Sequence, residues 1–337
     1  MHAFAIQGGF GIENLKPFET DEPKPGYGQV LVKLHAASLN YRDLMTVSGS
    51  YNPKQPLPLI PLSDGAGEIV EIGEGVVSLK VGDRVAGAFF QSWLAGPPPA
   101  TLHKVSLGGP LPGVLAEYAV FEEGGAIKFP YHFSYEQAAT LPCAAVTAWR
   151  ALFVEGKLKP GETVLIQGTG GVSVFALQLA KAAGARVILT SSSDEKIAKA
   201  KSLGADETIN YLKVSDWEKE ALRLTDGEGV DQVVEVGGAR TLGKSLSAVR
   251  SGGFIGMIGV LSGSTEPVNI APILMKSITI KGVYVGSSEM FHALNRAIGT
   301  QKSEPVIDRV YPFHDSNEAF RSLKRAGHFG KIVIKIV

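Results

Sequence analysis

The stretch from Val164 to Ser193, VLIQGTGGVSVFALQLAKAAGARVILTSSS, places a run of glycines between a strand pattern and a helix pattern. Gly168 and Gly170 stand where the backbone must turn tightly and approach a ligand closely. The helix that follows offers free N–H groups and the positive end of a dipole to an anion. This order of elements is typical of dinucleotide binding, with a tight turn that binds no ligand as the alternative. The predicted cofactor-binding residues of this turn are Gly168, Thr169, Gly170, Gly171 and Val172.

Two positions depart from the usual dinucleotide pattern. Ser173 stands where a third glycine is typical, and we expect its small side chain to fit with slightly wider packing. Ser191 ends the second strand where an acid would bind the ribose of NAD, and with Ser192 and Lys196 it offers donors to a 2′-phosphate. NADP(H) is therefore preferred over NAD(H). The run from Ser192 to Glu195 also has the form of a helix N-cap, and both roles hold if Ser192 caps while Ser191 and Lys196 face the phosphate.

Composition limits the classes of function. The 337 residues suffice for about two domains, and 45% hydrophobic residues allow large cores. Because 33 basic residues balance 33 acidic residues, we expect no nucleic-acid partner. No apolar run reaches roughly 18 residues and the N-terminus lacks a signal-peptide pattern, which predicts a cytoplasmic protein without a membrane partner. With one cysteine, Cys143, and scattered histidines, no bound metal is expected.

The hydrophobic pattern changes along the chain. Residues 1–127 carry strand-like segments broken by glycine turns, and Ser134 with Gln137 forms the pattern of a capping box that opens a helix. Six short strands then alternate with helices, which predicts an α/β fold with a doubly wound parallel sheet in the order 3-2-1-4-5-6. The predicted strands are Thr163–Gln167, Arg186–Thr190, Glu207–Asn210, Val230–Val236, Phe254–Val260 and Ile278–Val285.

Two other segments lack this alternation. Residues 89–114 form a loop rich in proline and glycine, whose length is typical of a functional lid. The tail after Glu289 predicts a helix over 290–299, an extended piece over 306–313, a second helix over 316–327 and a strand over 331–337.

The whole chain resembles the medium-chain dehydrogenase/reductase superfamily. The resemblance rests on LIPLSDGAGEIVEIGEGVVSLKVGDRV, LPCAAVTAWRAL, LKPGETVLIQGTGGVSVFALQLAKAAGARVI, LGADETINY and GHFGKIVIKIV. It implies a GroES-like, β-rich catalytic domain of residues 1–127 and 288–337. A Rossmann dinucleotide-binding domain of residues 128–287 is expected between these two parts, with the active site in the cleft.

The resemblance also raises the question of zinc, because many members are zinc alcohol dehydrogenases. The family's catalytic cysteine falls at Asn40, and its histidine and glutamate fall at Ser63 and Asp64. Only Cys143 matches a ligand position, and the cysteine-rich structural-zinc lobe is replaced by residues 89–114, which contain no cysteine. The chain therefore resembles a zinc-free branch, similar to quinone reductases and enoyl-thioester reductases.

Without zinc, an alkoxide lacks a Lewis acid, whereas reduction of an activated C=C bond needs only a donor near the substrate's oxygen or α-carbon. The resemblance implies Asn40 beside the nicotinamide and Tyr51 as proton donor, with Tyr41 and Asp64 as further catalytic candidates. Packing or helix capping is the alternative for each. Further cofactor contacts implied by the resemblance are Asn40, Thr147, Tyr211, Gly259, Val260, Val285, Gly286 and Lys331.

The leading hypothesis is an NADPH-dependent, zinc-independent oxidoreductase that reduces an enone, enal, enoyl group or quinone. A metal-free alcohol or aldehyde oxidoreductase and a non-catalytic NADPH-binding protein are the alternatives. A homodimer, alone or within a tetramer, is expected because the predicted edge strand 278–285 exposes unpaired backbone groups with only Lys281 as a charged blocker. Coverage of this edge by residues 271–276 or a loop is the alternative.

Overall fold

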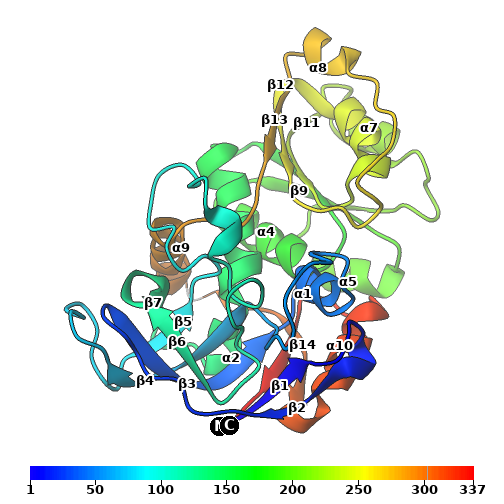
Figure 1. The fold of residues 1–337 in the computed structure, drawn as a ribbon. Helices are drawn as coiled ribbons and strands as arrows, with labels where there is room; N and C mark the ends of the chain where they lie inside the picture. The colour runs from blue at the N-terminus through cyan, green and yellow to red at the C-terminus, as the bar shows by residue number, and fades with distance from the viewer. Residues whose placement is uncertain (302) are drawn as a thin grey trace. The chain divides into compact units, whose positions relative to one another are not determined.

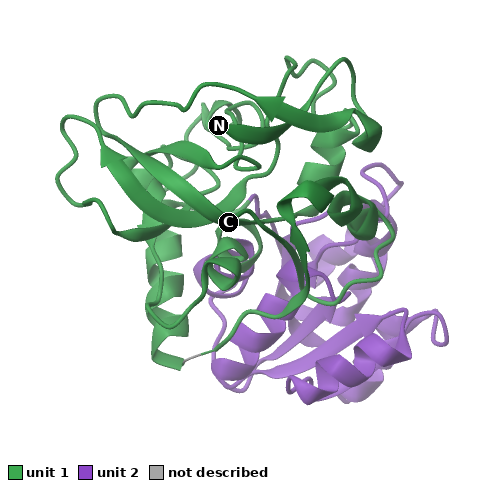
Figure 2. Cartoon of the chain, turned by 90° about the horizontal axis from the view of Figure 1, so that it is seen from below, with its two compact units in different colours: residues 1–146, 285–337 green, residues 147–284 purple. Residues whose placement is uncertain are grey.

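The computed structural model describes residues 1–301 and 303–337, and the chain divides into two compact units (Figure 2). Unit 1 comprises Met1–Val146 and Val285–Val337, and unit 2 comprises Thr147–Tyr284. Residues 128–146, which we expected in the dinucleotide-binding domain, pack within unit 1. One reason is that α2 (Tyr135–Ala139) lies against the sheet, where the Ser38 hydroxyl donates to Ala139 O at 2.8 Å. The limits of the two functional domains stay a prediction.

Unit 1 is built on a seven-stranded sheet to which both ends of the chain contribute. The last strand pairs antiparallel with β3, in a register that sets Val333 opposite Ser38. Buried Leu34 and Phe121 belong to the core beneath this sheet. The path is β14 (Ile307–Pro312), β15 (Lys331–Lys335), β3 (Gln29–Ser38), β4 (Asp64–Ile72), β5 (Arg84–Gly87) and β7 (Ala126–Lys128), with β6 (Tyr118–Glu122) paired to β3 and a separate pair β1 (His2–Ile6) and β2 (Leu15–Glu19).

The elements predicted for the C-terminal tail of unit 1 are present in the structure. The helix over 290–299 is α9 and the one over 316–327 is α10, while the extended piece and final strand are β14 and β15. The helices are α1 (Tyr41–Val47), α2, α9 (Ser288–Gln301) and α10 (Ser316–Lys324).

Unit 2 contains a six-stranded parallel sheet with the predicted order 3-2-1-4-5-6, here β10-β9-β8-β11-β12-β13. Apolar residues fill its central strands, among them Leu165 and Val233, because helices cover a parallel sheet on its faces. Figure 1 shows α4 beside β9, and α4 packs on β8 as well. The strands are β8 (Thr163–Gln167), β9 (Arg186–Ser191), β10 (Glu207–Asn210), β11 (Val230–Glu235), β12 (Val249–Met257) and β13 (Thr279–Gly282). The helices are α4 (Gly171–Ala182), α5 (Asp194–Ser202), α6 (Trp217–Leu224), α7 (Ala239–Ala248) and α8 (Ala271–Met275).

The last two strands end earlier than predicted. β12 stops at Met257 because the N–H groups of Ile258 and Gly259 turn to Glu235 O, at 2.9 and 3.2 Å. β13 stops at Gly282, and Val285 then adopts φ 51°, a left-handed conformation that a strand cannot contain. The predicted strand ends at 260 and 285 were therefore wrong.

The helix predicted from Ser134 is present and opens with the expected capping box. Gln137 N donates to the Ser134 hydroxyl at 3.2 Å, and Ser134 N donates to Gln137 Oε1 at 2.9 Å. Past α2 the helix widens into π-helical turns over Leu141–Ala145 and Arg150–Glu155, which flank α3 (Val146–Trp149). Within the described part of the chain, no helix combines the length and apolar character that crossing a membrane requires.

Candidate functional site

The glycine turn of unit 2 lies between β8 and α4, as predicted. Gly168 has φ 72°, which favours glycine, and its N–H donates to Thr190 O at 2.8 Å. Gly170 is the N-cap of α4 with an ordinary extended φ of −78°, and a Cβ placed on it would meet no atom within 4 Å. The backbone does not need glycine at this position, so the open space in front of the helix start is the reason to have one. This turn fits the pyrophosphate of a dinucleotide.

Ser173 replaces the third glycine without opening a gap. Its hydroxyl donates to Gln167 O at 2.7 Å, and the side chain is buried. The hydrogen bond ties the first turn of α4 to the end of β8. A serine therefore fits this position because its hydroxyl forms a hydrogen bond to β8, which a glycine cannot form.

The end of β9 differs from the expectation in one respect. Ser193, and not Ser192, caps α5, since Lys196 N donates to the Ser193 hydroxyl at 3.3 Å. The prediction that Ser192 caps this helix was wrong. Ser191 is buried, and its carbonyl accepts from Tyr211 N at 3.0 Å, so the predicted Ser191 and Tyr211 lie together at the ends of β9 and β10.

A carboxylate that the pattern did not single out lies beside these residues. Asp194 begins α5 and accepts from Lys213 Nζ at 2.6 Å and from Asn210 Nδ2 at 2.7 Å. The hydrogen bond from Lys213 lowers the pKa of Asp194 below its ordinary value, and the bond from Asn210 adds to this. Lys213 thus offsets the negative charge of Asp194 at the start of α5, and Lys196 lies in the first turn of the same helix.

Glu235 was missed by sequence reasoning. It is fully buried at the end of β11 and accepts from Gln167 Nε2 at 2.6 Å and from the Ser245 hydroxyl at 2.5 Å. The N–H groups of Gly237 and Gly238 also donate to it, at 2.8 and 2.9 Å. The carboxylate joins the ends of β8 and β11, the two strands between which the sheet order reverses. An acid at the end of the predicted strand, directly before Val236 and Gly237, was the available signal.

Other predicted cofactor residues have evident roles in the fold. A Cβ on Gly259 would lie 2.2 Å from Val236 O, so close backbone packing requires this glycine. Val260 is in the same loop and accepts from Gly263 N at 3.0 Å, and Thr147 is buried in α3. In unit 1, a Cβ on Gly286 would lie 2.7 Å from the Val146 side chain. Their contacts with a cofactor stay predictions.

The predicted residues of unit 1 gather around a buried ammonium group. Lys331 Nζ donates to Asn40 Oδ1 at 2.5 Å and to Leu39 O at 2.6 Å, and it lies 3.9 Å from Asp64 Oδ2. Lys331 is 2% exposed and Asp64 is 0% exposed. Asp64 also accepts from the Ser63 hydroxyl at 2.7 Å and from Cys143 N at 3.1 Å. The structure therefore brings Asn40, Asp64 and Lys331 together.

A second buried ion pair lies beside this group. Asp43 Oδ2 accepts from Asn40 N at 2.8 Å, and Asp43 Oδ1 lies 3.2 Å from Arg42 Nη1. Burial raises the pKa of Asp43 to about 6, against the opposing charge of Arg42. Arg42 also donates to the carbonyls of Leu107, Gly108 and Gly109, so it anchors the C-terminal part of the long loop.

The two tyrosines are placed differently. The Tyr51 ring lies 4.9 Å from the Arg42 guanidinium carbon and is half-buried, whereas Tyr41 is 45% exposed. The loop 89–114 is anchored on its other side by buried Phe89 and Trp93. The most exposed part of this loop is segment 94–104, and its function as a lid stays a prediction.

The four zinc-ligand positions do not fit a zinc ion. Asn40 and Ser63 offer neutral oxygens, and the ammonium of Lys331 lies against Asn40 and Asp64, where it would repel a second cation. Burial raises the pKa of the Cys143 thiol, which disfavours the thiolate that zinc needs. Among residues 1–301 and 303–337, no group of three or more His, Cys, Asp and Glu side chains is placed to hold a metal.

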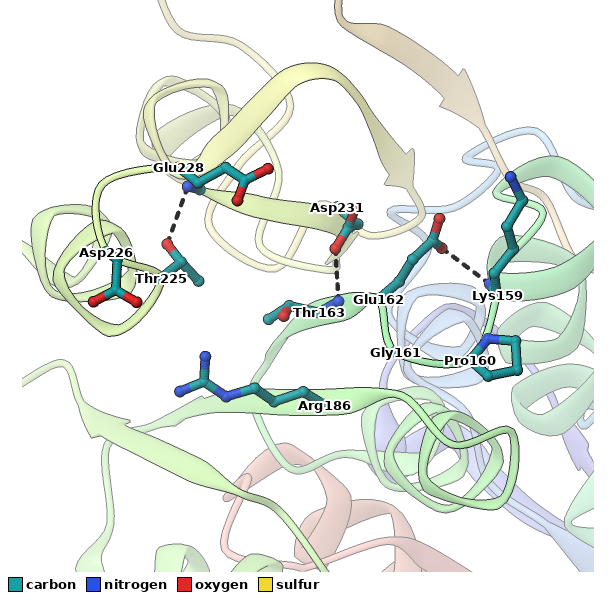
Figure 3. Close-up of a pocket in the computed structure, with 11 residues that line it drawn as sticks. Lys159, Pro160, Gly161, Glu162, Thr163, Arg186, Thr225, Asp226, Glu228 and Asp231 are labelled. Carbon is teal, nitrogen blue, oxygen red and sulfur yellow. Dashed lines mark hydrogen bonds between the residues drawn. The ribbon is translucent and has the colours of Figure 1, made fainter.

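A separate pocket of about 530 Å³ lies at the other end of the unit 2 sheet, where β8, β9 and β11 begin (Figure 3). Its polar groups already serve the fold. Asp231 accepts from Thr163 N and from Arg250 Nε, both at 2.7 Å, and Arg186 donates to Leu224 O at 2.8 Å. The glycine turn belongs to the carboxyl ends of the strands, so this pocket is not part of the predicted cofactor site.

Comparison with known proteins agrees with this architecture. Residues 26–131 match the model of the alcohol dehydrogenase GroES-like domain, and residues 171–299 match that of zinc-binding dehydrogenases. A zinc-type alcohol dehydrogenase-like protein of Schizosaccharomyces pombe is 45% identical, over 97% of this chain and 96% of the relative. An acryloyl-coenzyme A reductase of Metallosphaera sedula is 29% identical, over 94% of this chain and 95% of the relative. The crystal structure of an NAD-dependent alcohol dehydrogenase, 34% identical, superposes with a TM-score of 0.92 over 100% of both chains.

Proposed function

Because the chain belongs to the medium-chain dehydrogenase/reductase superfamily and is an oxidoreductase of that type, we propose that it reduces a carbonyl-conjugated C=C bond or a quinone with NADPH, without zinc. The observation that carries the proposal is the Lys331 ammonium held 2.5 Å from Asn40 Oδ1 and 3.9 Å from Asp64. A cation supplied by the chain occupies the region where the resemblance places a metal. The acryloyl-coenzyme A reductase among the relatives supports a C=C substrate.

The bound cofactor supplies a hydride, and the chain has to handle the charge that then develops on the substrate's oxygen. An amide N–H aimed at that oxygen stabilises the charge. Asn40 carries such a group, and Tyr51 carries a phenol that can deliver a proton to the α-carbon. Both residues lie in unit 1, at the start of α1 and just beyond its end. An alcohol substrate would instead need a strong electrophile for its alkoxide, which these neutral donors do not provide.

The proposed cofactor is NADPH, bound by the glycine turn and by the ends of β9 and β10. Ser191, Tyr211 and Lys196 offer donors and a positive charge to a 2′-phosphate, and Lys213 neutralises Asp194 beside them. The alternative, NADH, is supported by the NAD-dependent alcohol dehydrogenase among the solved relatives. We place the reaction in the cytoplasm.

The test is a turnover assay on a purified, chelator-treated protein. NADPH is added with quinones, enals and enones, and absorbance at the cofactor band is followed; a matched sample receives NADP⁺ and alcohols. We expect oxidation of NADPH by at least one conjugated substrate and no recovery effect from added zinc. Restoration of activity by zinc would contradict the proposal, and tight NADPH binding without any turnover would favour a non-catalytic binding protein.

We also propose a homodimer that pairs the β13 edges of two copies. Thr279, Lys281 and Gly282 are exposed on this edge strand, and α8 beside it exposes 84% of Leu274 and 82% of Met275. A proline at Val283 is an unsuitable probe, because its N–H already donates to Met257 O at 2.8 Å within the chain.

The better test of the dimer replaces Leu274 and Met275 together by glutamate, which adds charge to an exposed surface and leaves the strand pairing intact. We expect the wild type to be a dimer at micromolar concentration by light scattering, and the double variant to shift towards monomer. A monomeric wild type refutes the dimer.

A further inference from the structure

The Lys331 side chain is directed into unit 1 by its own backbone. Gly330 precedes it with φ 83°, and a Cβ on Gly330 would lie 2.4 Å from Val306 O. Lys331 N donates to the same carbonyl at 3.0 Å. The close approach of these two segments fixes the start of β15, so the lysine leaves the strand in one direction.

The Lys331 ammonium is buried among other charged side chains of both signs. Asp64 and Asp43 supply two buried carboxylates, while Arg42 and Lys331 supply two buried cations. Removing an ammonium from water is costly unless carbonyl or carboxylate groups replace the water, as Leu39 O and Asn40 Oδ1 do here. Lys331 is therefore part of a balanced group, and its bond to Oδ1 orients the Asn40 amide together with the capping box that Asn40 forms with Asp43.

The lysine determines which side of the Asn40 amide faces it. An ammonium group only donates hydrogen bonds, so the amide oxygen must face Lys331 and the NH₂ group must face away. Asn40 Nδ2 is buried and has no hydrogen-bond partner among residues 1–301 and 303–337. An unsatisfied buried donor is costly, and a bound acceptor oxygen would satisfy it. Polarisation of the amide by the ammonium also strengthens Nδ2–H as a donor.

From this geometry we infer that Lys331 is a positioning residue that holds the Asn40 amide with its N–H group presented to the carbonyl oxygen of the substrate. The inference rests on the proposed function and names the group recognised: a neutral acceptor oxygen, as in an enone or a thioester. A substrate that offers only a donor at this point, such as an amine, would leave Asn40 Nδ2 unpaired. Lys331 then acts through Asn40 and not by contact with the cofactor.

A double-mutant cycle distinguishes a Lys331 that positions Asn40 from a Lys331 that contacts the cofactor. Lys331→Met removes the ammonium, Asn40→Leu removes the donor, and the double variant removes both, each assayed with NADPH and cyclohex-2-enone. We expect each single change to lower kcat/KM about 100-fold, the double variant to fall no further than Asn40→Leu, and the NADPH dissociation constant to stay within about twofold. The matched control is Lys335→Met, an exposed lysine on the same strand, which should change neither quantity.

Additive losses, or NADPH binding weakened about 10-fold or more in Lys331→Met alone, would overturn the inference and make Lys331 a cofactor contact. A second measurement does not depend on turnover. In protein labelled with ¹⁵N-asparagine, the side-chain signals of Asn40, assigned by their loss in Asn40→Leu, should move in Lys331→Met and not in Lys335→Met. Addition of cyclohex-2-enone should shift them in the wild type and in Lys335→Met, but not in Lys331→Met.

If the Asn40 side-chain amide signals are unchanged in Lys331→Met, the positioning role is refuted even when the enzyme reduces enones. Moved signals without any turnover in the wild type would instead refute the proposed function and leave the positioning role standing. If Lys331→Met does not fold, Lys331→Gln takes its place, since its amide can still donate to Leu39 O without the charge.

Discussion

Two sites present hydrogen-bond donors by opposite means: the glycine turn of unit 2, and the residues Asn40, Arg42, Asp43, Asp64 and Lys331 of unit 1. The second site is called the Lys331 group. The turn uses backbone N–H groups at the start of α4, with open space where Gly170 lacks a side chain. The Lys331 group uses an amide side chain held by buried charges, and its members come from the link between β3 and α1, from α1, from β4 and from β15. The glycine turn depends on the absence of a side chain at Gly170, whereas the Lys331 group depends on buried charges of opposite sign.

This difference determines how each site should fail. Atoms added to the turn block the ligand without disturbing the fold, because the space is open to begin with. A charge removed from the Lys331 group changes the balance of buried charges, so it should alter the free energy of unfolding and its dependence on pH. The four predictions below test this contrast, starting with the largest expected effect.

Gly170→Asp should separate binding from stability most clearly. The residue is the N-cap of α4 with φ −78° and ψ −175°, a conformation open to any residue, and aspartate is a preferred N-cap. We expect the free energy of unfolding to stay equal or rise slightly. NADPH binding should weaken at least about 100-fold, because the new carboxylate would occupy the predicted phosphate site. Fluorescence titration with NADPH and urea unfolding measure the two effects.

The control for this prediction is Gly168→Ala. Its φ of 72° should cost about 1 kcal/mol of stability, whatever happens to binding. An aspartate at position 170 that leaves NADPH binding intact would mean that the turn is only a tight connection between strand and helix.

Asp43→Asn probes the charged site through pH. The pKa of Asp43 is raised from 3.8 to about 6, so its contribution to stability is fully present below about 3.8 and lost as pH rises through about 6. Asparagine keeps an acceptor for Asn40 N and carries no charge. We expect the wild type to lose on the order of 3 kcal/mol relative to the variant between pH 3.5 and 7.5, as measured by urea unfolding.

Asp194→Asn serves as the comparison, since the pKa of Asp194 is lowered by Lys213 and Asn210. Its contribution has the opposite sign: it is present above the unfolded pKa and lost as pH falls through the folded one. A wild-type minus Asp43→Asn difference that is constant with pH would show that Asp43 ionises normally in the folded protein.

The two sites also differ in how far the sequence could predict them. The turn lies within one continuous stretch, where periodicity and glycine positions suffice, so its strand, turn, helix and even the sheet order were predicted correctly. Lys331 and Asn40 are 291 residues apart, and the resemblance named both without indicating that one holds the other. Side-chain direction depends on how β15 pairs with β14, where Lys331 lies opposite Ile307, and no local pattern contains that register.

Capping was harder to predict than strand order. Three consecutive serines can each cap a helix, and the one that does is Ser193, because β9 ends at Ser191 and α5 begins at Asp194. Glu235 was missed because a single acid after an apolar strand is common in loops. Its five hydrogen-bond partners come from β8, the following loop and α7, which only the folded sheet brings together.

Ser191→Asp tests the charge preference of the turn. An added carboxylate at the end of β9 should weaken NADPH binding about 10-fold through repulsion of the 2′-phosphate, with NADH binding retained or improved. The matched control, Ser202→Asp, adds the same charge at the far end of α5 and should change neither affinity. Titration of both cofactors into the wild type is the first measurement, and equal affinities there would contradict the preference inferred from the serines.

Ser173→Ala and Ser173→Gly give the smallest effects and show why the glycine triplet is incomplete. The hydroxyl donates to Gln167 O at 2.7 Å in a buried setting, so its loss costs about 1 kcal/mol, partly offset in alanine by better helix propensity. Glycine loses the bond and adds about 1 kcal/mol of its own inside the helix. NADPH affinity should not change in either variant, because the hydroxyl bonds to the strand and leaves the open space at Gly170 as it is. Urea unfolding should rank the wild type above alanine and alanine above glycine, whereas tighter NADPH binding in Ser173→Gly would mean that the serine restricts the phosphate site.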